Sequence, residues 1–118
     1  MHISDDDQIN LEKLQDIIRR NLAAHYSIEE LASIALMSRS NLIKKYKFYF
    51  GISLYAQLQQ LRLSLAKELL ENTSQSIKLI AKKCGYRHAC NFSNAFRELE
   101  GVTAKAWRDS RRSADNKF

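Results

Sequence analysis

The sequence of 118 residues predicts an all-α protein, and three observations support this prediction. Proline is absent and glycine occurs three times, so long helices can form with few breaks. Apolar residues recur at helical spacing, whereas the strict alternation that is typical of half-buried strands is hard to find. The third observation is that one helical pattern occurs twice in the chain, which favours a small helical unit used twice.

The two copies of the pattern can be read directly. Residues 27–51 are SIEELASIALMSRSNLIKKYKFYFG, and residues 76–101 are SIKLIAKKCGYRHACNFSNAFRELEG. Both copies open with Ser-Ile, and both are closed by a glycine that precedes a branched apolar residue and a hydroxyl residue. The second copy carries one extra residue near Ala89-Cys90. Two copies are too few for a solenoid, so a pair of related lobes is expected.

The first helix is expected over about 8–24. The three acidic residues of 5–7 suit the positive end of its dipole. Its spacing of apolar residues predicts a stripe that faces the core. The members of this stripe are Ile9, Leu14, Ile17, Ile18 and Leu22.

The first copy of the pattern predicts two helices. Ser27 is a good N-cap for the first, and Glu30 three residues later completes a capping box. That helix ends near residues 36–37, and Ser38 caps the next one. A helical wheel separates a core side of the second helix from a polar side. The core side carries Leu42, Tyr46 and Tyr49, and the polar side carries Ser40, Lys44, Lys47 and Phe48, with Asn41 beside them.

Gly51 ends this helix, and Ser53 caps a long connector that runs to Asn72. The connector has two apolar stripes, which predict packing on more than one side. One stripe consists of Leu54, Leu58, Leu61, Leu65 and Leu69, and the other of Leu63, Ala66 and Leu70.

The second copy repeats the plan. Ser76 opens a short helix, residues 85–86 make a turn, and a helix over 91–100 follows. Its core side is expected to carry Phe92, Phe96 and Leu99, while Cys90, Asn94 and Arg97 point the other way. Thr103 caps a last helix in which Ala106 and Trp107 pack.

These elements predict one domain over 1–118 with four parts. The first lobe covers 8–52, the connector helix 53–72 and the second lobe 73–112, and a disordered tail covers 113–118.

Charge is distributed unevenly along the chain. Residues 1–37 hold three basic and seven acidic side chains, and residues 38–118 hold sixteen basic and six acidic ones. A basic body of this kind favours an anionic partner such as nucleic acid, although a merely soluble basic surface remains an alternative. No apolar run is long enough for a membrane span, and no signal peptide is visible, so no membrane partner is expected. With only two cysteines, a cytoplasmic location is expected.

A short helix, a tight turn and a second helix with an exposed polar face form the helix-turn-helix plan. The major groove of B-DNA admits one α-helix, so the second helix of each copy can present side chains to base edges. The connector of twenty residues is about 30 Å long, and major grooves on one face of DNA recur every ~34 Å. We therefore expect one chain to place two reading helices in adjacent grooves.

At this level of detail the chain resembles the DNA-binding domain of the AraC/XylS family of bacterial transcription regulators. The resemblance covers roughly residues 14–108. The second copy carries it most clearly, in Ile80-Ala81, Gly85-Tyr86, Phe92-Ser93, Phe96-Arg97 and Gly101-Val102-Thr103, and further matches lie in RLSLAKELL at 62–70 and in Trp107-Arg108. The resemblance implies seven helices, with two helix-turn-helix units joined by a long helix.

The resemblance also implies roles for individual residues. The positions that read bases correspond to Ser40, Asn41, Ile43 and Lys44 in the first unit and to Ala89, Cys90, Asn91, Ser93 and Asn94 in the second. Positions expected to contact phosphates are Arg39, Lys47, Arg87, His88 and Arg97. The implied partners are double-stranded DNA and RNA polymerase. Most members of the family carry a separate sensor domain, and nothing in this sequence resembles one, so both a stand-alone regulator and the C-terminal end of a longer one stay open.

The sequence departs from the family pattern at Ala104, where proline is common, and Ala89 and Cys90 are poor hydrogen-bonding groups for reading bases. Cys84, His88 and Cys90 are close enough in sequence to suggest a metal site. The pattern is weak because a fourth ligand is missing, so neither a metal nor a cofactor is expected. No nucleophile elbow or phosphate loop indicates an enzyme. A helical protein-interaction module that keeps the fold without reading DNA is the alternative function.

Overall fold

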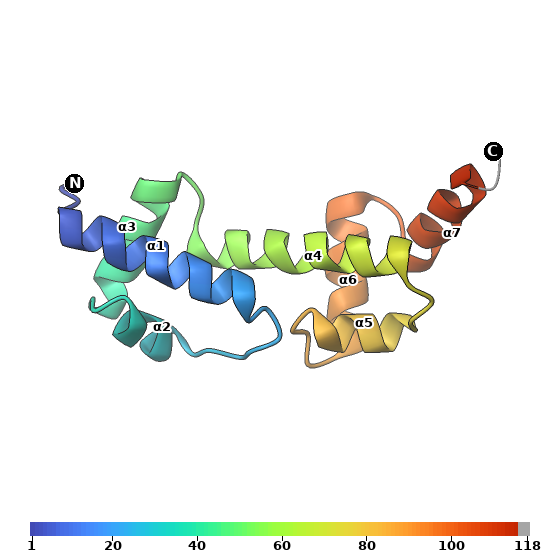
Figure 1. Cartoon of the computed structure of the whole chain (residues 1–118), viewed down its shortest axis with the longest axis horizontal. Coiled ribbons are helices and arrows are strands. Elements are labelled where there is room, and N and C mark those ends of the chain that lie inside the picture. Colours follow the sequence, from blue (N-terminus) through green and yellow to red (C-terminus); the bar gives the residue numbers. More distant parts are fainter. Residues whose placement is uncertain (116–118) are drawn as a thin grey trace. The chain divides into compact units, whose positions relative to one another are not determined.

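The computed structural model describes residues 1–115 and folds them into seven α-helices without a strand (Figure 1). The all-α prediction is therefore confirmed. Every predicted helix is present, with ends that differ by up to four residues from the expected ones. The helices are α1 (Asp5–Arg20), α2 (Ile28–Ile34), α3 (Arg39–Phe50), α4 (Leu54–Asn72), α5 (Ile77–Lys83), α6 (Ala89–Glu100) and α7 (Ala104–Asp115).

The start of α1 lies three residues before the predicted one. Ser4 is its N-cap: the Ser4 hydroxyl accepts a bond from the Asp7 amide at 3.0 Å, and the Asp7 carboxylate accepts one from the Ser4 amide at 3.2 Å. This reciprocal pair is a complete capping box. The box predicted at Ser27 and Glu30 is only half formed, because the structure gives the bond from the Glu30 amide to the Ser27 hydroxyl alone.

The chain divides into two compact units, one over Met1–Leu61 and one from Arg62 onward, and α4 contributes to both. In the first unit, α1, α2, α3 and the first half of α4 enclose one apolar core. Tyr46 fills the centre of this core, and its hydroxyl bonds to the Gln57 amide oxygen, which also accepts a bond from Gln15. The buried residues are Leu11, Leu14, Ile18, Leu31, Ala32, Ala35, Leu42, Tyr46 and Leu54.

The second unit has the same plan, in which the second half of α4 takes the place of α1 and α7 takes the place of the first half of α4. Edge-to-face aromatic contacts link Tyr86 with Phe92 and Phe96 with Trp107. The buried residues of this core are Leu63, Ala66, Leu70, Ile80, Ala81, Cys84, Phe92, Phe96 and Ala104. The first half of α4 packs in one core and the second half in the other. The predicted stripe that begins at Leu54 is therefore divided, since Leu65 and Leu69 pack against the second core.

Some positions differ from the predicted core. Ile9, Leu99 and Ala106 are exposed, and their places are taken by Leu11, Ala95 and Ala104. Each replacement lies two or four residues away on the same helix, so the helix itself is predicted correctly, while the side that faces the core differs from the predicted one.

The C-terminal helix is longer than expected. Helix α7 runs to Asp115 and so covers the first three residues of the predicted tail 113–118. Residues 116–118 lie outside the described part of the chain. Within residues 1–115, no helix has the length and apolar character that crossing a membrane requires.

Candidate nucleic-acid interface

Each unit contains a short helix, a tight turn and a second helix. In the first unit the Leu36 amide bonds to the Ser33 carbonyl at 3.1 Å, and the Met37 amide to the Ala32 carbonyl at 3.0 Å. The second unit repeats both bonds with the same lengths, from Gly85 to Lys82 and from Tyr86 to Ala81. Hydrogen bonds of this pattern end a helix and turn the chain. The two units therefore share one turn geometry as well as one sequence pattern.

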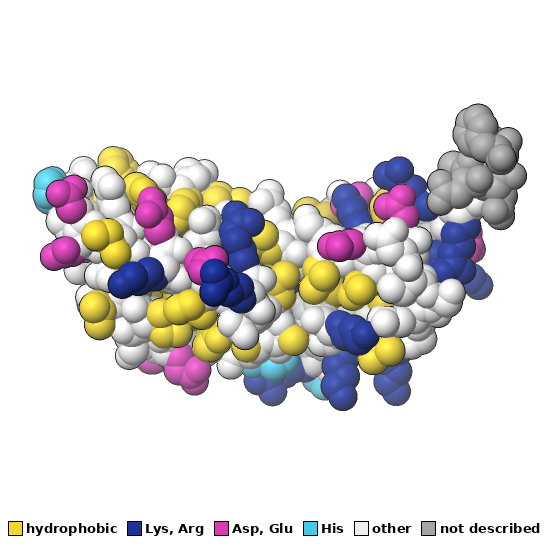
Figure 2. Space-filling view, viewed as in Figure 1, with side chains coloured by type: hydrophobic (Ala, Val, Ile, Leu, Met, Phe, Trp, Pro, Cys, Tyr) yellow, Lys and Arg dark blue, Asp and Glu magenta, His cyan; other side chains and the backbone are white. Residues whose placement is uncertain are grey.

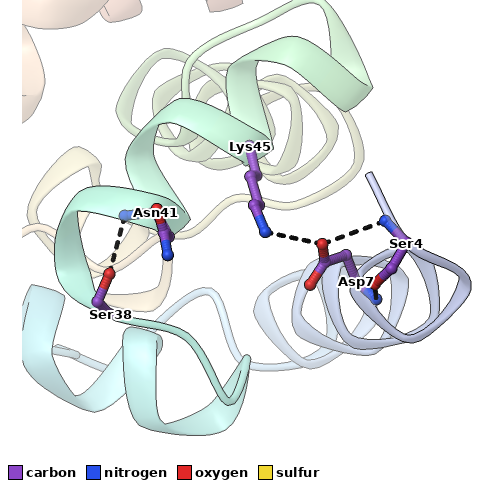
Figure 3. Close-up of polar contacts among 5 residues, drawn as sticks. All are labelled: Ser4, Asp7, Ser38, Asn41 and Lys45. Atoms are coloured by element: carbon purple, nitrogen blue, oxygen red, sulfur yellow. Dashed lines mark hydrogen bonds and ion pairs between the residues drawn. The ribbon is translucent and has the colours of Figure 1, made fainter. Parts of the chain in front are cut away.

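Helix α3 has one buried side and one open side. Leu42 and Tyr46 are at most 1% exposed, and the Ser38 hydroxyl caps the helix by accepting a bond from the Asn41 amide at 3.2 Å (Figure 3). The four positions expected to read bases in this unit all lie exposed near the start of the helix: Ser40, Asn41, Ile43 and Lys44.

An ion pair holds α3 against α1. Lys45 Nζ lies 2.8 Å from Asp7 Oδ2, and the same oxygen belongs to the capping box of α1 (Figure 3). The hydrogen bond from Lys45, followed by the one from the Ser4 amide, lowers the pKa of Asp7. Both side chains are largely shielded from solvent, so this pair helps to orient α3 within the first unit. This pair was not predicted from the sequence. The available signal was that Lys45 lies on the same side of α3 as Tyr49, which is expected to face the core.

Helix α6 shows the same two-sided construction. Phe92, Ala95 and Phe96 are buried, and the Asn94 side chain lies exposed on the other side. Ala89 is half-buried and packs against the core, so it is the least available of the expected base-reading positions. The remaining expected positions, Cys90, Asn91 and Ser93, are exposed.

The side chains expected to contact phosphates are also exposed, namely Arg39, Lys47, Arg87, His88 and Arg97. Arg39 is engaged with a carboxylate in the free protein, because its Nη1 lies 3.4 Å from Glu29 Oε1. Such an exposed pair contributes little to stability and competes only weakly with a phosphate.

The metal alternative gains no support from the geometry. Cys84 is fully buried in the core of the second unit, and burial raises the pKa of its thiol to about 11. Cys90 is exposed on α6. Among residues 1–115, no three His, Cys, Asp or Glu side chains gather in a way that could hold a metal ion.

Two further side chains make aromatic contacts within the second unit. Arg62 lies with its guanidinium 5.8 Å from the centre of the Tyr86 ring. Trp107 packs against the core and stacks against Arg111 at 4.8 Å.

Comparison with known proteins agrees with this construction. The helix-turn-helix domain family matches residues 31–110. The transcriptional activator RhaR of Pectobacterium carotovorum is 32% identical over 111 residues, which are 91% of this chain and 39% of that protein. The chain spans 35–39% of the length of the first curated relatives that it matches.

Solved structures show the same fold. The DNA-binding domain of AdpA, solved in complex with a target DNA, matches with a TM-score of 0.87 at 25% identity, over 92% of this chain and 98% of that one. An AraC-type transcriptional regulator from Chromobacterium violaceum matches with a TM-score of 0.77 at 28% identity, over 92% of this chain and 96% of that one. The chain therefore belongs to the AraC-type family of helix-turn-helix domains.

Proposed function

We propose that this chain is a sequence-specific, double-stranded-DNA-binding domain of a transcription regulator. The observation that carries the proposal is the pair of helices α3 and α6, each buried on an apolar side and exposed on a polar side behind the same turn. A helix that enters the major groove needs this construction, because its back must pack while its front meets base edges. The likeness to a domain solved on its target DNA supports the proposal.

Two side chains are proposed as the main readers. Lys44 on α3 donates to guanine O6 or N7, and Asn94 on α6 pairs with adenine N6 and N7. Both are exposed, and each lies six residues after the N-cap of its helix, which is Ser38 for α3 and His88 for α6. Ser40, Asn41, Ile43, Cys90, Asn91 and Ser93 are proposed to line the same surfaces, with Ala89 at the edge.

The exposed basic side chains Arg39, Lys47, Arg87 and Arg97 are proposed to hold phosphates, as is His88. Such contacts fix the register of a protein on DNA without reading its sequence. Helix α4 has nineteen residues and is about 28 Å long, which suits reading helices in successive grooves that recur every ~34 Å.

The surroundings of the domain are proposals as well. The relatives are bacterial regulators more than twice as long as this chain. Their length supports the proposal that a sensor domain acts together with this DNA-binding domain. RNA polymerase is proposed as a further partner, the bacterial cytoplasm as the location, and no enzymatic activity is proposed.

A gel-shift with genomic fragments at rising salt tests the proposed function. We expect a subset of fragments to stay bound at salt concentrations that release the others, because base contacts add to the phosphate contacts. A helical protein-interaction module would instead release all fragments together, as charge alone dictates. That second outcome would remove the proposal.

A further inference from the structure

Helix α5 carries a basic surface that none of the expected DNA contacts includes. Lys78 and Lys82 lie one turn apart on this helix and are exposed, and Lys83 beside them is exposed too. In the space-filling view, Lys and Arg side chains project from the side of the second unit on which α5 lies (Figures 1 and 2).

The first unit has the opposite charge at the matching positions. Ser27 and Ser76 cap α2 and α5 in the same way, so positions can be matched by counting from these caps. Lys78 then corresponds to Glu29, and Lys82 corresponds to Ser33. The same short helix is thus acidic in one unit and basic in the other.

The ion pairs follow this reversal. Glu29 of α2 pairs with Arg39 of α3, whereas the matching position on α5 carries the cation Lys78. In the part of the chain that the structure describes, the ion pairs found do not include Lys78, Lys82 or Lys83. These three ammonium groups are therefore available to bind an anion of another molecule.

The net charges of the two units extend the contrast. Residues 1–61 hold seven basic and seven acidic side chains, so their formal charge is zero. Residues 62–118 hold twelve basic and six acidic ones, so the whole net charge of +6 belongs to the second unit. Attraction to a polyanion therefore comes almost entirely from this unit at distances beyond direct contact.

We infer that Lys78 and Lys82, flanked by Lys83, form a phosphate-binding surface on α5, through which the second unit supplies most of the sequence-independent affinity for DNA while α6 reads bases. The inference rests on the proposed DNA binding. In a helix-turn-helix the first helix crosses the phosphate backbone while the second reads bases, so α5 meets phosphates when α6 enters the groove. On α2 of the first unit, Glu29 and Glu30 instead repel phosphates, so the DNA contacts of that unit come from α3, including Arg39 and Lys47.

A matched pair of double variants tests this division. Lys78→Gln/Lys82→Gln removes two charges from α5. Lys13→Gln/Arg19→Gln removes two exposed charges from α1, which belongs to neither of the helix pairs α2–α3 and α5–α6. Affinity is measured against salt for a random-sequence duplex and for a duplex selected by the wild-type protein. Thermal unfolding of each variant confirms that it is folded.

The α5 variant is expected to lower the slope of log K against log salt by about 1.8 on both duplexes, since each lost phosphate contact removes about 0.9. Its preference for the selected duplex should stay within about twofold of the wild type, because phosphate contacts carry no sequence information. The α1 variant should leave the slope unchanged. Equal slopes for the two double variants would overturn the inference, and would point to an acidic protein surface as the partner of α5.

The reverse change gives a second measurement. Glu29→Lys places on α2 the charge that α5 carries, and it should raise affinity for the random and the selected duplex by a similar factor, because phosphate contacts carry no sequence information. No gain on the random duplex would contradict the role given to this position. If the wild-type protein shows no preference for the selected duplex over the random one, the proposed function is wrong. The salt slopes measured on the random duplex would still test whether α5 binds phosphates.

Discussion

Leu36 and Gly85 occupy the same place in the two turns and share a left-handed backbone, with φ of 56° and 94°. Both donate a hydrogen bond to the carbonyl three residues earlier at 3.1 Å. Leu36 is the only non-glycine residue with positive φ in the described part of the chain. A leucine pays a steric cost there that glycine avoids, because its Cβ crowds the following carbonyl. The first turn is therefore strained where the second is not.

Leu36→Gly should raise the free energy of unfolding by about 0.5–1 kcal/mol. The Leu36 side chain is 78% exposed, so removing it sacrifices little buried apolar surface. Urea unfolding measures the change. Leu36→Ala is the control, since it removes the same side chain but keeps the Cβ, and it should not stabilise. Equal stabilities of the glycine and alanine variants would show that the turn is unstrained.

Arg108 is expected to be essential for the stability of the second unit. Its guanidinium donates to the carbonyls of Leu70, Thr73 and Gln75 at 3.0, 3.3 and 2.6 Å, and these three groups end α4 and lead into α5. Arg108→Met leaves the Leu70 and Gln75 carbonyls without their charged donor, whereas the Thr73 carbonyl keeps its bond from Arg112 at 2.8 Å, and the change should cost about 2–4 kcal/mol.

Arg108→Lys should recover less than half of that loss, because one ammonium cannot reproduce the planar fork of three donors. Lys105→Met on the exposed side of α7 is the control. Denaturant unfolding followed by Trp107 fluorescence reports on this unit, and a loss for Arg108→Met no larger than that of the control would refute the role.

The Asp7–Lys45 pair predicts a pH dependence. The pKa of Asp7 is lowered in the folded protein, so the pair contributes stability above the ordinary carboxyl pKa of about 3.9 and loses it as pH falls through the folded value. The melting temperature of the wild type should therefore exceed that of Asp7→Asn at pH 6, and the gap should close towards pH 2. Asp6→Asn, at an exposed neighbouring position, should show no such gap. A gap that is constant with pH would contradict this assignment.

Alanine variants of Lys44 and Lys47 should distinguish a side chain that reads bases from one that contacts a phosphate. Lys44→Ala is expected to cost about 1–3 kcal/mol at one base pair and to relax the choice of base there. Lys47→Ala should weaken binding to every sequence and lower the salt slope by about one. Titrations against a set of single-base variants of the selected duplex distinguish the two effects. Identical behaviour of both variants on all duplexes would make the separation wrong.

The two cysteines offer a probe of the α6 surface. Cys90 is exposed, whereas Cys84 is buried and its thiol pKa is about 11, so one equivalent of a thiol reagent should react quickly with the native protein at pH 8. Selected DNA should slow that reaction at least tenfold if α6 enters the groove. Cys90→Ser removes the fast phase and serves as the control. Unslowed labelling under saturating DNA would place Cys90 away from the duplex.

The sequence was sufficient for the order of helices and for both polar faces, because caps at Ser38, Ser53, Ser76 and Thr103 and the apolar spacing are local signals. It misjudged rotation in α6, where Leu99 is exposed and Ala95 buried, since only the packing partner decides which flank of an amphipathic helix turns inward. The capping box at Ser4 was missed because its partner is an aspartate rather than the usual glutamate or glutamine.

The polar contacts between distant helices could not be predicted from the sequence for a similar reason. The partners Asp7 and Lys45 are 38 positions apart, and Arg108 and Leu70 are equally distant. No local pattern connects such residues, so their pairing appears only in the folded structure.

The most direct test of the central claim is a base-substitution scan of a duplex selected by the wild-type protein. We expect two clusters of sensitive base pairs whose centres lie about ten base pairs apart, one for α3 and one for α6. Lys44→Ala should abolish sensitivity in one cluster only, and Asn94→Ala in the other only. A single cluster, or sensitivity that both variants abolish together, would contradict two reading helices in one chain.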